Sequence, residues 1–236
     1  DSKQSILDYI TDNKQDTVIT THNAWGIQDT AEANAFFQAA IDAPLPYIAL
    51  DSETTGLYPR DGYMLGLSLS YEQDRGAYVD TECFDEESER LLQELFDKKT
   101  VVFHNAKFDM AFFEYHFNFR FPQFEDTMLL HYLIDENPGT HGLKQLAMKY
   151  TIYGDYEKPM YDWIDQYSKE RGIIKNEFNW GDIPFEIMKI YAGMDDDVTF
   201  LLYEKFVKIK QNKRLCKVYD NILIPGCRFL TDIQDN

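Results

Sequence analysis

The chain has 236 residues, 44% of them hydrophobic and 15% aromatic, which is enough for a folded domain and too apolar for a disordered chain. No apolar run approaches the roughly 18 residues of a membrane span, and the first residues do not form a signal peptide. The formal net charge of −18, from 41 acidic and 23 basic residues, argues against broad capture of nucleic acid by a basic surface.

The spacing of apolar residues and turn residues predicts the elements of the first half of the chain. In order, these are a helix over 2–13, a strand over 16–23, a helix over 29–41, and strands over 47–51, 64–71 and 76–80. A polar turn at 72–75 separates the last two strands. This half is therefore expected to supply most of a sheet.

Strands and helices alternate in the second half, and helices then dominate. The predicted elements are a helix over 86–96, a strand over 100–104, and helices over 107–117, 126–134 and 141–150. The aromatic and polar section 151–181 contains Pro159 and Gly172 and is predicted to be irregular. Asp182 is expected to cap a long helix that runs to about Gln211. The order predicts a mixed sheet flanked by helices, an α/β layer fold.

The last 25 or so residues are predicted to form a helix with an unpartnered apolar face, which Pro225-Gly226 could kink. The chain begins without Met, so we expect a piece of a longer protein. Cys83, Cys216 and Cys227 are few and widely spaced. They favour neither a disulfide framework nor a zinc site, and a reducing, intracellular setting fits best.

Two carboxylates, Asp51 and Glu53, end the apolar run that begins near Tyr47. Residues i and i+2 of a strand project from the same face, so these two side chains are expected to point together. Two like charges held that close repel each other unless a cation compensates them. Carboxylate oxygens suit hard divalent ions, so the pair indicates a metal site on a rigid strand.

A second candidate lies between Asn105 and Asp109, where a buried strand runs into a helix. Asn105 can cap that helix and can also offer an amide to a ligand. The plain alternative makes Asn105 a simple cap and Asp109 a solvated helix residue.

A third candidate is the pair Tyr191 and Asp195, which are four residues apart and so share one face of a helix. Asp196 and Asp197 are expected to point elsewhere and to solvate the helix or to pair with nearby cations. The alternatives here are a charged, exposed helix face and an acid that looks inward at a metal, with a tyrosine hydroxyl one turn away.

Together the three motifs resemble the DEDD superfamily of 3′–5′ exonucleases, in the branch whose third motif carries tyrosine. The sequence DSETTGL at 51–57 resembles the first motif, N-x-x-F-D at 105–109 the second, and Y-x-x-x-D at 191–195 the third. The segments EDTMLLHYLI, HGLKQLAMKY and YAGMDDDVTFLLYEKF are similar to the proofreading domain of family A polymerases, the DNA polymerase I type. The resemblance implies a ribonuclease H-like mixed sheet flanked by helices.

The resemblance also implies phosphodiester hydrolysis with two divalent cations, Mg²⁺ or Mn²⁺, roughly 3.5–4 Å apart. Asp51, Glu53 and Asp195 would hold the inner metal, and Asp51 would bridge to a second ion near Asp109. Tyr191 would orient the attacking water, because its unperturbed pKa of about 10 makes it a poor base at neutral pH.

By motif position, Leu57 would wedge against the terminal base, Asn105 would contact the substrate near its 3′ end, and Phe108 would stack or pack beside a base. Ordinary core packing is the alternative for Leu57 and Phe108. The expected partners are a single-stranded DNA 3′ end and a polymerase domain of the same full-length chain. Residues 1–210 would form the exonuclease domain and residues 211–236 the start of a linker. We expect a monomer in the cytoplasm of a bacterium or of a phage-infected host cell.

Other readings of the motifs remain open. DSETT at 51–55 comes near the D-x-D-x-T motif of phosphatases with an aspartyl nucleophile, although its second acid is Glu53. An RNA-trimming enzyme of the ribonuclease D kind also carries the tyrosine. The chain could instead be a degenerate, inactive scaffold for a polymerase, although all four acids and Tyr191 are retained.

Overall fold

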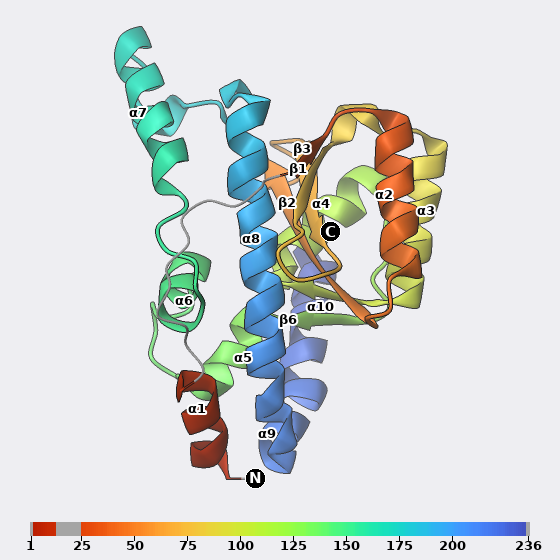
Figure 1. Ribbon diagram of the computed structural model, residues 1–236, viewed down its shortest axis with the longest axis vertical. Coiled ribbons are helices and arrows are strands. Elements are labelled where there is room, and N and C mark those ends of the chain that lie inside the picture. The colour runs from red at the N-terminus through yellow and green to blue at the C-terminus, as the bar shows by residue number, and fades with distance from the viewer. Residues whose placement is uncertain (1, 13–24, 235–236) are drawn as a thin grey trace.

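A computed structural model describes residues 2–12 and 25–234 of the chain. The strand predicted at 16–23 lies outside the described residues. The centre of the fold is a mixed sheet flanked by helices (Figure 1), as predicted. The strands are β1 (Trp25–Ile27), β2 (Tyr47–Thr54), β3 (Met64–Ser70), β4 (Ala77–Asp80), β5 (Thr100–Phe103) and β6 (Phe124–Asp126).

The sheet has the strand order β1-β4-β3-β2-β5-β6. β2, β3 and β4 are antiparallel neighbours, whereas β1 pairs with β4, β5 with β2, and β6 with β5 in parallel. The short strands β1 and β6 were not predicted, because three residues are too few for an alternating pattern to be visible. The other strands agree with prediction to within a few residues.

One face of the sheet is covered by α2 (Thr30–Asp42), α3 (Glu86–Lys98) and α4 (Ala106–Phe117). α2 and α3 lie side by side on the right of the view in Figure 1. Asp29 caps α2 by accepting from the Glu32 backbone N–H, and Asp85 caps α3 through a capping box with Ser88. The three helices enclose a core that is almost wholly apolar, including Phe37, Leu50, Leu92, Phe96 and Phe113.

The opposite face is crossed by the long helix α8 (Phe185–Phe206). α5 (Thr127–Ile134), α6 (Leu143–Tyr150) and α1 (Lys3–Asp12) pack around it in a second core. α8 approaches the sheet so closely that a Cβ on Gly76, which precedes β4, would lie 2.2 Å from the Gly193 carbonyl oxygen. A residue larger than glycine at position 76 would therefore prevent this packing.

The section predicted to be irregular contains a well-formed helix, α7 (Lys158–Arg171), so that prediction was wrong. Pro159 lies in the first turn, where its missing N–H costs nothing, and Gly172 ends the helix with a left-handed conformation, φ 64°. The two residues that suggested a loop are the residues that bound the helix. α7 stands beside the upper part of α8 (Figure 1).

The long helix α8 begins at Phe185 with Pro184 at the N-cap position, so Asp182 is not its cap. A 3₁₀ segment (Val207–Gln211) follows α8. The remaining helical elements are α9 (Lys213–Val218), a π-helical turn (Tyr219–Leu223) and α10 (Ile224–Gln234). The kink that was expected at Pro225-Gly226 is replaced by this π-helical turn, which lies just before Pro225.

α10 packs on α4, where Arg228 forms a two-pronged ion pair with Glu114 at 2.6 and 2.8 Å. Phe229, Leu230 and Ile233 remain exposed, so the expected apolar face is only partly covered.

The division of the chain at residue 210 stays a prediction. In the described part of the chain the cysteines are free, and a helix that could cross a membrane was not found.

Candidate active site

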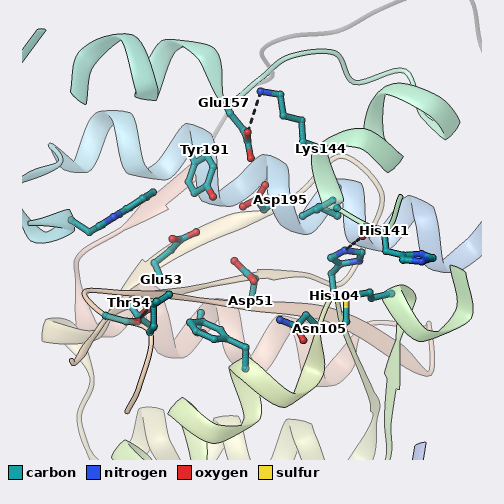
Figure 2. Close-up of a pocket in the computed structure, with 18 of the residues that line it drawn as sticks. Asp51, Glu53, Thr54, His104, Asn105, His141, Lys144, Glu157, Tyr191 and Asp195 are labelled. Carbon is teal, nitrogen blue, oxygen red and sulfur yellow. Dashed lines mark hydrogen bonds and ion pairs between the residues drawn. The ribbon is translucent and has the colours of Figure 1, made fainter. Parts of the chain in front are cut away.

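The acids of the first and third motifs converge between β2 and α8. Along β2, Ile48 and Leu50 face the apolar core under α2 and α3, so the alternate residues Asp51 and Glu53 face α8. Oxygens of Asp51, Glu53 and Asp195 all lie within 4.8 Å of one another. Figure 2 shows the two strand carboxylates turned toward Asp195 and Tyr191 on the helix.

This group of three acids is costly to bury. Glu53 is 6% exposed and Asp195 5% exposed, and Glu53 Oε1 has no hydrogen-bond partner among the described residues. Burial raises the pKa of Glu53 well above its usual range, and the charges of Asp51 and Asp195 raise it further. An unpaired, buried carboxylate oxygen in an all-oxygen donor set fits a hard divalent cation. The residues present therefore suit the metal that the motifs imply.

Asp109 lies next to this group and outside it. The Ser52 backbone N–H and hydroxyl both donate to Asp109 Oδ1, at 2.9 and 2.6 Å. Burial raises the pKa of Asp109 to about 7, although both hydrogen bonds from Ser52 lower it. Asp109 also raises the pKa of the neighbouring Asp51 through its charge. The side chain is buried, so the plain alternative of a solvated helix residue is wrong.

Two tyrosines adjoin Asp195, and only one was predicted. Tyr191 lies one turn before Asp195, and burial raises its pKa well above 10, so the phenol keeps its proton. Tyr156, from the section before α7, donates its hydroxyl to Asp195 Oδ1 at 2.5 Å and is almost fully buried. Sequence spacing gave no signal for Tyr156, because it lies 39 residues from its partner. Only the richness of 151–181 in aromatic residues pointed to this section.

Asn105 occupies the N-cap position of α4, but its side chain makes no capping hydrogen bond. The buried Asp126 carboxylate accepts from the backbone N–H groups of Asn105 and Ala106 instead, at 3.1 and 2.8 Å. Asn105 itself is left-handed, with φ 72°, a conformation that asparagine tolerates better than most residues. The role of simple cap is therefore wrong, and the amide lines the cavity described next.

The acids open into a cavity of about 1080 Å³. It is lined by the predicted residues Asp51, Glu53, Leu57, Asn105, Phe108, Tyr191 and Asp195, and by unpredicted ones that include His141, Lys144, Lys175 and Trp180. Leu57 is 77% exposed, so core packing is excluded for it. Phe108 is partly buried and packs on Phe112, with 5.1 Å between ring centroids, so it combines core packing with a place at the cavity.

Asp196 and Asp197 do not solvate α8, and that prediction was wrong. Both are fully buried, because the sheet and other helices surround α8. Asp197 Oδ1 accepts from the Gly76 backbone N–H at 2.7 Å and from the Ser70 hydroxyl at 3.2 Å. Neither oxygen of Asp196 has a hydrogen-bond partner among the described residues, and burial raises its pKa.

Comparison with known proteins agrees with the motifs. A family described as 3′–5′ exonuclease matches residues 25–211. The DNA polymerase of Escherichia phage T5 is 43% identical over 218 residues, which cover 89% of this chain and 26% of that polymerase. The DNA polymerase I of Borreliella burgdorferi is 26% identical over 197 residues, covering 80% of this chain and 20% of that protein. The chain thus spans about a quarter or less of these relatives.

Solved structures show the same fold at low sequence identity. Escherichia coli RNase D, an exoribonuclease involved in structured RNA processing, has a TM-score of 0.64 at 16% identity, covering 91% of this chain and 51% of that one. The POL domain of Pol1 from M. smegmatis has a TM-score of 0.55 at 16% identity, covering 88% of this chain and 31% of that one. The expected ribonuclease H-like fold is confirmed. The chain belongs to the family of 3′–5′ exonuclease domains found in DNA polymerases.

Proposed function

We propose that this chain removes nucleotides from DNA 3′ ends as the proofreading domain of a polymerase of the DNA polymerase I type. The observation that carries the proposal is the convergence of Asp51, Glu53 and Asp195 within 4.8 Å beside Tyr191, at the wall of an open cavity. The likeness of 89% of the chain to a phage DNA polymerase supports DNA as the substrate and a polymerase domain as its partner.

In this proposal Asp51, Glu53 and Asp195 would hold one divalent cation, Mg²⁺ or Mn²⁺, and Asp51 and Asp109 would hold a second. Such cations supply Lewis-acid chemistry, which generates the nucleophile at neutral pH and stabilises the leaving 3′ oxygen. Ser52 fixes one oxygen of Asp109 through two hydrogen bonds. Tyr156 fixes Asp195 in the same way.

Tyr191 orients the attacking water as a hydrogen-bond donor. Its pKa is raised by burial and by the surrounding carboxylates, so it keeps its proton and does not serve as the base. Leu57, 77% exposed at the cavity, wedges against the terminal base. Asn105, whose amide does not cap α4, contacts the 3′ end, and Phe108 offers part of its ring to a base.

The test is degradation of 5′-labelled single-stranded DNA with Mg²⁺ or Mn²⁺, comparing the parent with Asp51→Ala/Glu53→Ala. The parent is expected to release 5′-mononucleotides stepwise from the 3′ end, and the double variant to release none. Equal activity of the two proteins would exclude this site. Mn²⁺ titration separates an active enzyme from an inert scaffold, which should bind no Mn²⁺ that depends on these carboxylates.

Hydrolysis of RNA 3′ ends is the second candidate, favoured by the structural likeness to Escherichia coli RNase D, an exoribonuclease. The same assay with an RNA of matched sequence decides between the two substrates. A kcat/KM at least tenfold higher for DNA supports the proofreading proposal, and the reverse ratio supports RNA trimming. Covalent trapping of an aspartyl phosphate on Asp51 would instead favour a phosphatase.

A further inference from the structure

The cavity that contains the acids extends to a second wall, the segment from Lys175 to Trp180. Lys175, Asn176, Phe178 and Trp180 line the same cavity as Asp51, Glu53 and Asp195. Ligand cavities of roughly 300–1,000 Å³ hold a drug-sized molecule, so about 1080 Å³ leaves room beyond one terminal nucleotide. In a bound strand, the group beyond the terminal nucleotide is the second nucleotide.

Lys175 is the cation at this cavity that is available to a phosphate. The other lining lysine, Lys144, lies 3.0 Å from Asp155 and 3.3 Å from Glu157, and Figure 2 shows it turned to Glu157. His104 also lines the cavity, but burial lowers its pKa to about 4, so it is neutral. Lys175 is exposed and has no carboxylate partner within 4.0 Å in the described part of the chain. A backbone phosphate that enters a site rich in carboxylates needs such a charge.

Trp180 supplies an aromatic surface at the same wall. Its indole is partly buried, and its ring contacts with Tyr161 and Phe178 are edge contacts at 90° and 71°. Among the described residues, none stacks parallel on the Trp180 ring. Base-aromatic stacking tolerates any sequence, because every base has a π face.

The wall is held rigidly by α7. Phe178 packs edge-on against Trp163 and Tyr167 at 6.4 and 6.1 Å, and those two rings stack on each other at 4.7 Å. Met160 and Ile164 of α7 are buried in the same small core as residues of α8. Ring contacts with Tyr161 and Phe178 therefore place Trp180 before a ligand arrives, which lowers the entropy lost on binding, while Lys175 extends from the same segment.

We propose that Lys175 and Trp180 form a subsite for the second nucleotide from the 3′ end of a single strand, an inference that rests on the function proposed above. Lys175 binds the phosphate on the 5′ side of that nucleotide, and Trp180 stacks on its base. The terminal nucleotide occupies the space beside Leu57 and Phe108, and the scissile phosphate lies between the two positions, at the carboxylates.

The test begins with binding, which does not depend on hydrolysis. In the Asp51→Ala/Glu53→Ala background, anisotropy of a labelled single-stranded oligonucleotide is measured over a range of salt concentrations. Lys175→Ala is expected to weaken binding and to reduce the slope of log K against log salt by about 0.7, the value of one phosphate contact in a single strand. Lys169→Ala, an exposed lysine on α7 outside the cavity, should leave the slope unchanged.

Trp180→Ala should weaken binding roughly tenfold, the loss of one stacked base, and Trp180→Phe should recover most of it. With the active sites intact, both Lys175→Ala and Trp180→Ala should raise KM for the oligonucleotide severalfold with little change in kcat. Neither should alter hydrolysis of the p-nitrophenyl ester of thymidine 5′-monophosphate, which has no second nucleotide. Thermal unfolding of each variant identifies any that fails to fold.

The two proposals fail in different ways. If the parent hydrolyses neither DNA nor RNA, the proposed function is wrong, and the binding data still judge the subsite. If the parent hydrolyses DNA but Lys175→Ala keeps the parental salt slope, and Lys175→Ala and Trp180→Ala both keep the parental KM, the subsite is wrong. Equal effects of Lys175→Ala on the oligonucleotide and on the nitrophenyl ester would also overturn it.

Discussion

Helices α3 and α8 cover opposite faces of one sheet and bury opposite kinds of side chain. α3 buries Leu91, Leu92, Leu95 and Phe96 and leaves its acids and Arg90 toward solvent. α8 buries Asp195, Asp196 and Asp197 within a single turn. Apolar burial stabilises a fold by about 25 cal/mol per Å², whereas a buried carboxylate costs free energy unless it is paired or bound to a metal.

The two faces of the sheet therefore have different roles. The α2–α3 face supplies the stability that holds β2 in place, and β2 then presents Asp51 and Glu53 to the α8 face. Buried carboxylates lower the stability of the metal-free protein, and in the proposed function a bound cation would offset this cost. Stability and chemistry should therefore respond separately to changes on the two faces.

The largest effect on stability is expected from Phe96→Ala on the α3 face. The ring is fully buried and lies 4.8–6.3 Å from the rings of Phe113, Phe119 and Phe121. Its truncation should lower the free energy of unfolding by about 3–5 kcal/mol, through lost burial and a cavity. Urea unfolding measures the change, and Phe229→Ala, at a 63% exposed site on α10, is the matched control.

At urea concentrations at which the variant is still folded, Phe96→Ala should keep the parental kcat and KM on single-stranded DNA. A variant that loses activity while still folded would contradict the division between the two faces.

The second prediction concerns pH in the absence of metal. Burial raises the pKa values of Asp51, Glu53 and Asp195 well above the usual carboxyl range, with like charges adding to the shift. The folded state then keeps protons that the unfolded chain has released, so stability is present at low pH and is lost as pH rises through the raised values. The loss amounts to about 1.4 kcal/mol per pH unit for each retained proton.

Unfolding in EDTA from about pH 7 upward measures this slope. That range avoids the opposite contribution of His104 and His131, whose pKa values burial lowers to about 4 and which gain protons only on unfolding in acid. Asp51→Asn/Glu53→Gln should have a shallower slope, and Mg²⁺ should flatten the parental one. Identical slopes for parent and variant in EDTA would show that these acids do not carry the pH dependence.

Much of the fold and of the site could be predicted because it depends on local pattern. The apolar periodicity of 86–96 gave α3, and the i, i+2 and i, i+4 spacings placed Asp51 with Glu53 and Tyr191 with Asp195. The long helix was predicted, but the expectation that Asp196 and Asp197 solvate it was wrong. Since α8 is covered on more than one side, Asp196 and Asp197 are buried where a one-sided helix would have exposed them.

Long-range contacts account for the other errors. Neither the hydrogen bond from Tyr156 to Asp195 nor the capping of α4 by Asp126 follows from spacing, because each joins residues 20 or more positions apart. The section 151–181 was misread because proline and glycine mark both loops and helix ends. Their distance from each other, 13 residues from Pro159 to Gly172, suits a helix of ordinary length.

The smallest effect is expected from Tyr156→Phe, a change at the edge of the α8 face. The change removes the hydroxyl that donates to Asp195 and keeps the buried ring. Loss of a hydrogen bond that orients a metal ligand typically lowers metal affinity or activity about 10- to 100-fold. The Mn²⁺ affinity and the kcat of Tyr156→Phe should therefore decrease by a factor in that range. Tyr153→Phe is the matched control, because Tyr153 is equally buried and its hydroxyl donates to Asp74. Equal Mn²⁺ affinity in both variants would mean that Asp195 is positioned by α8 alone.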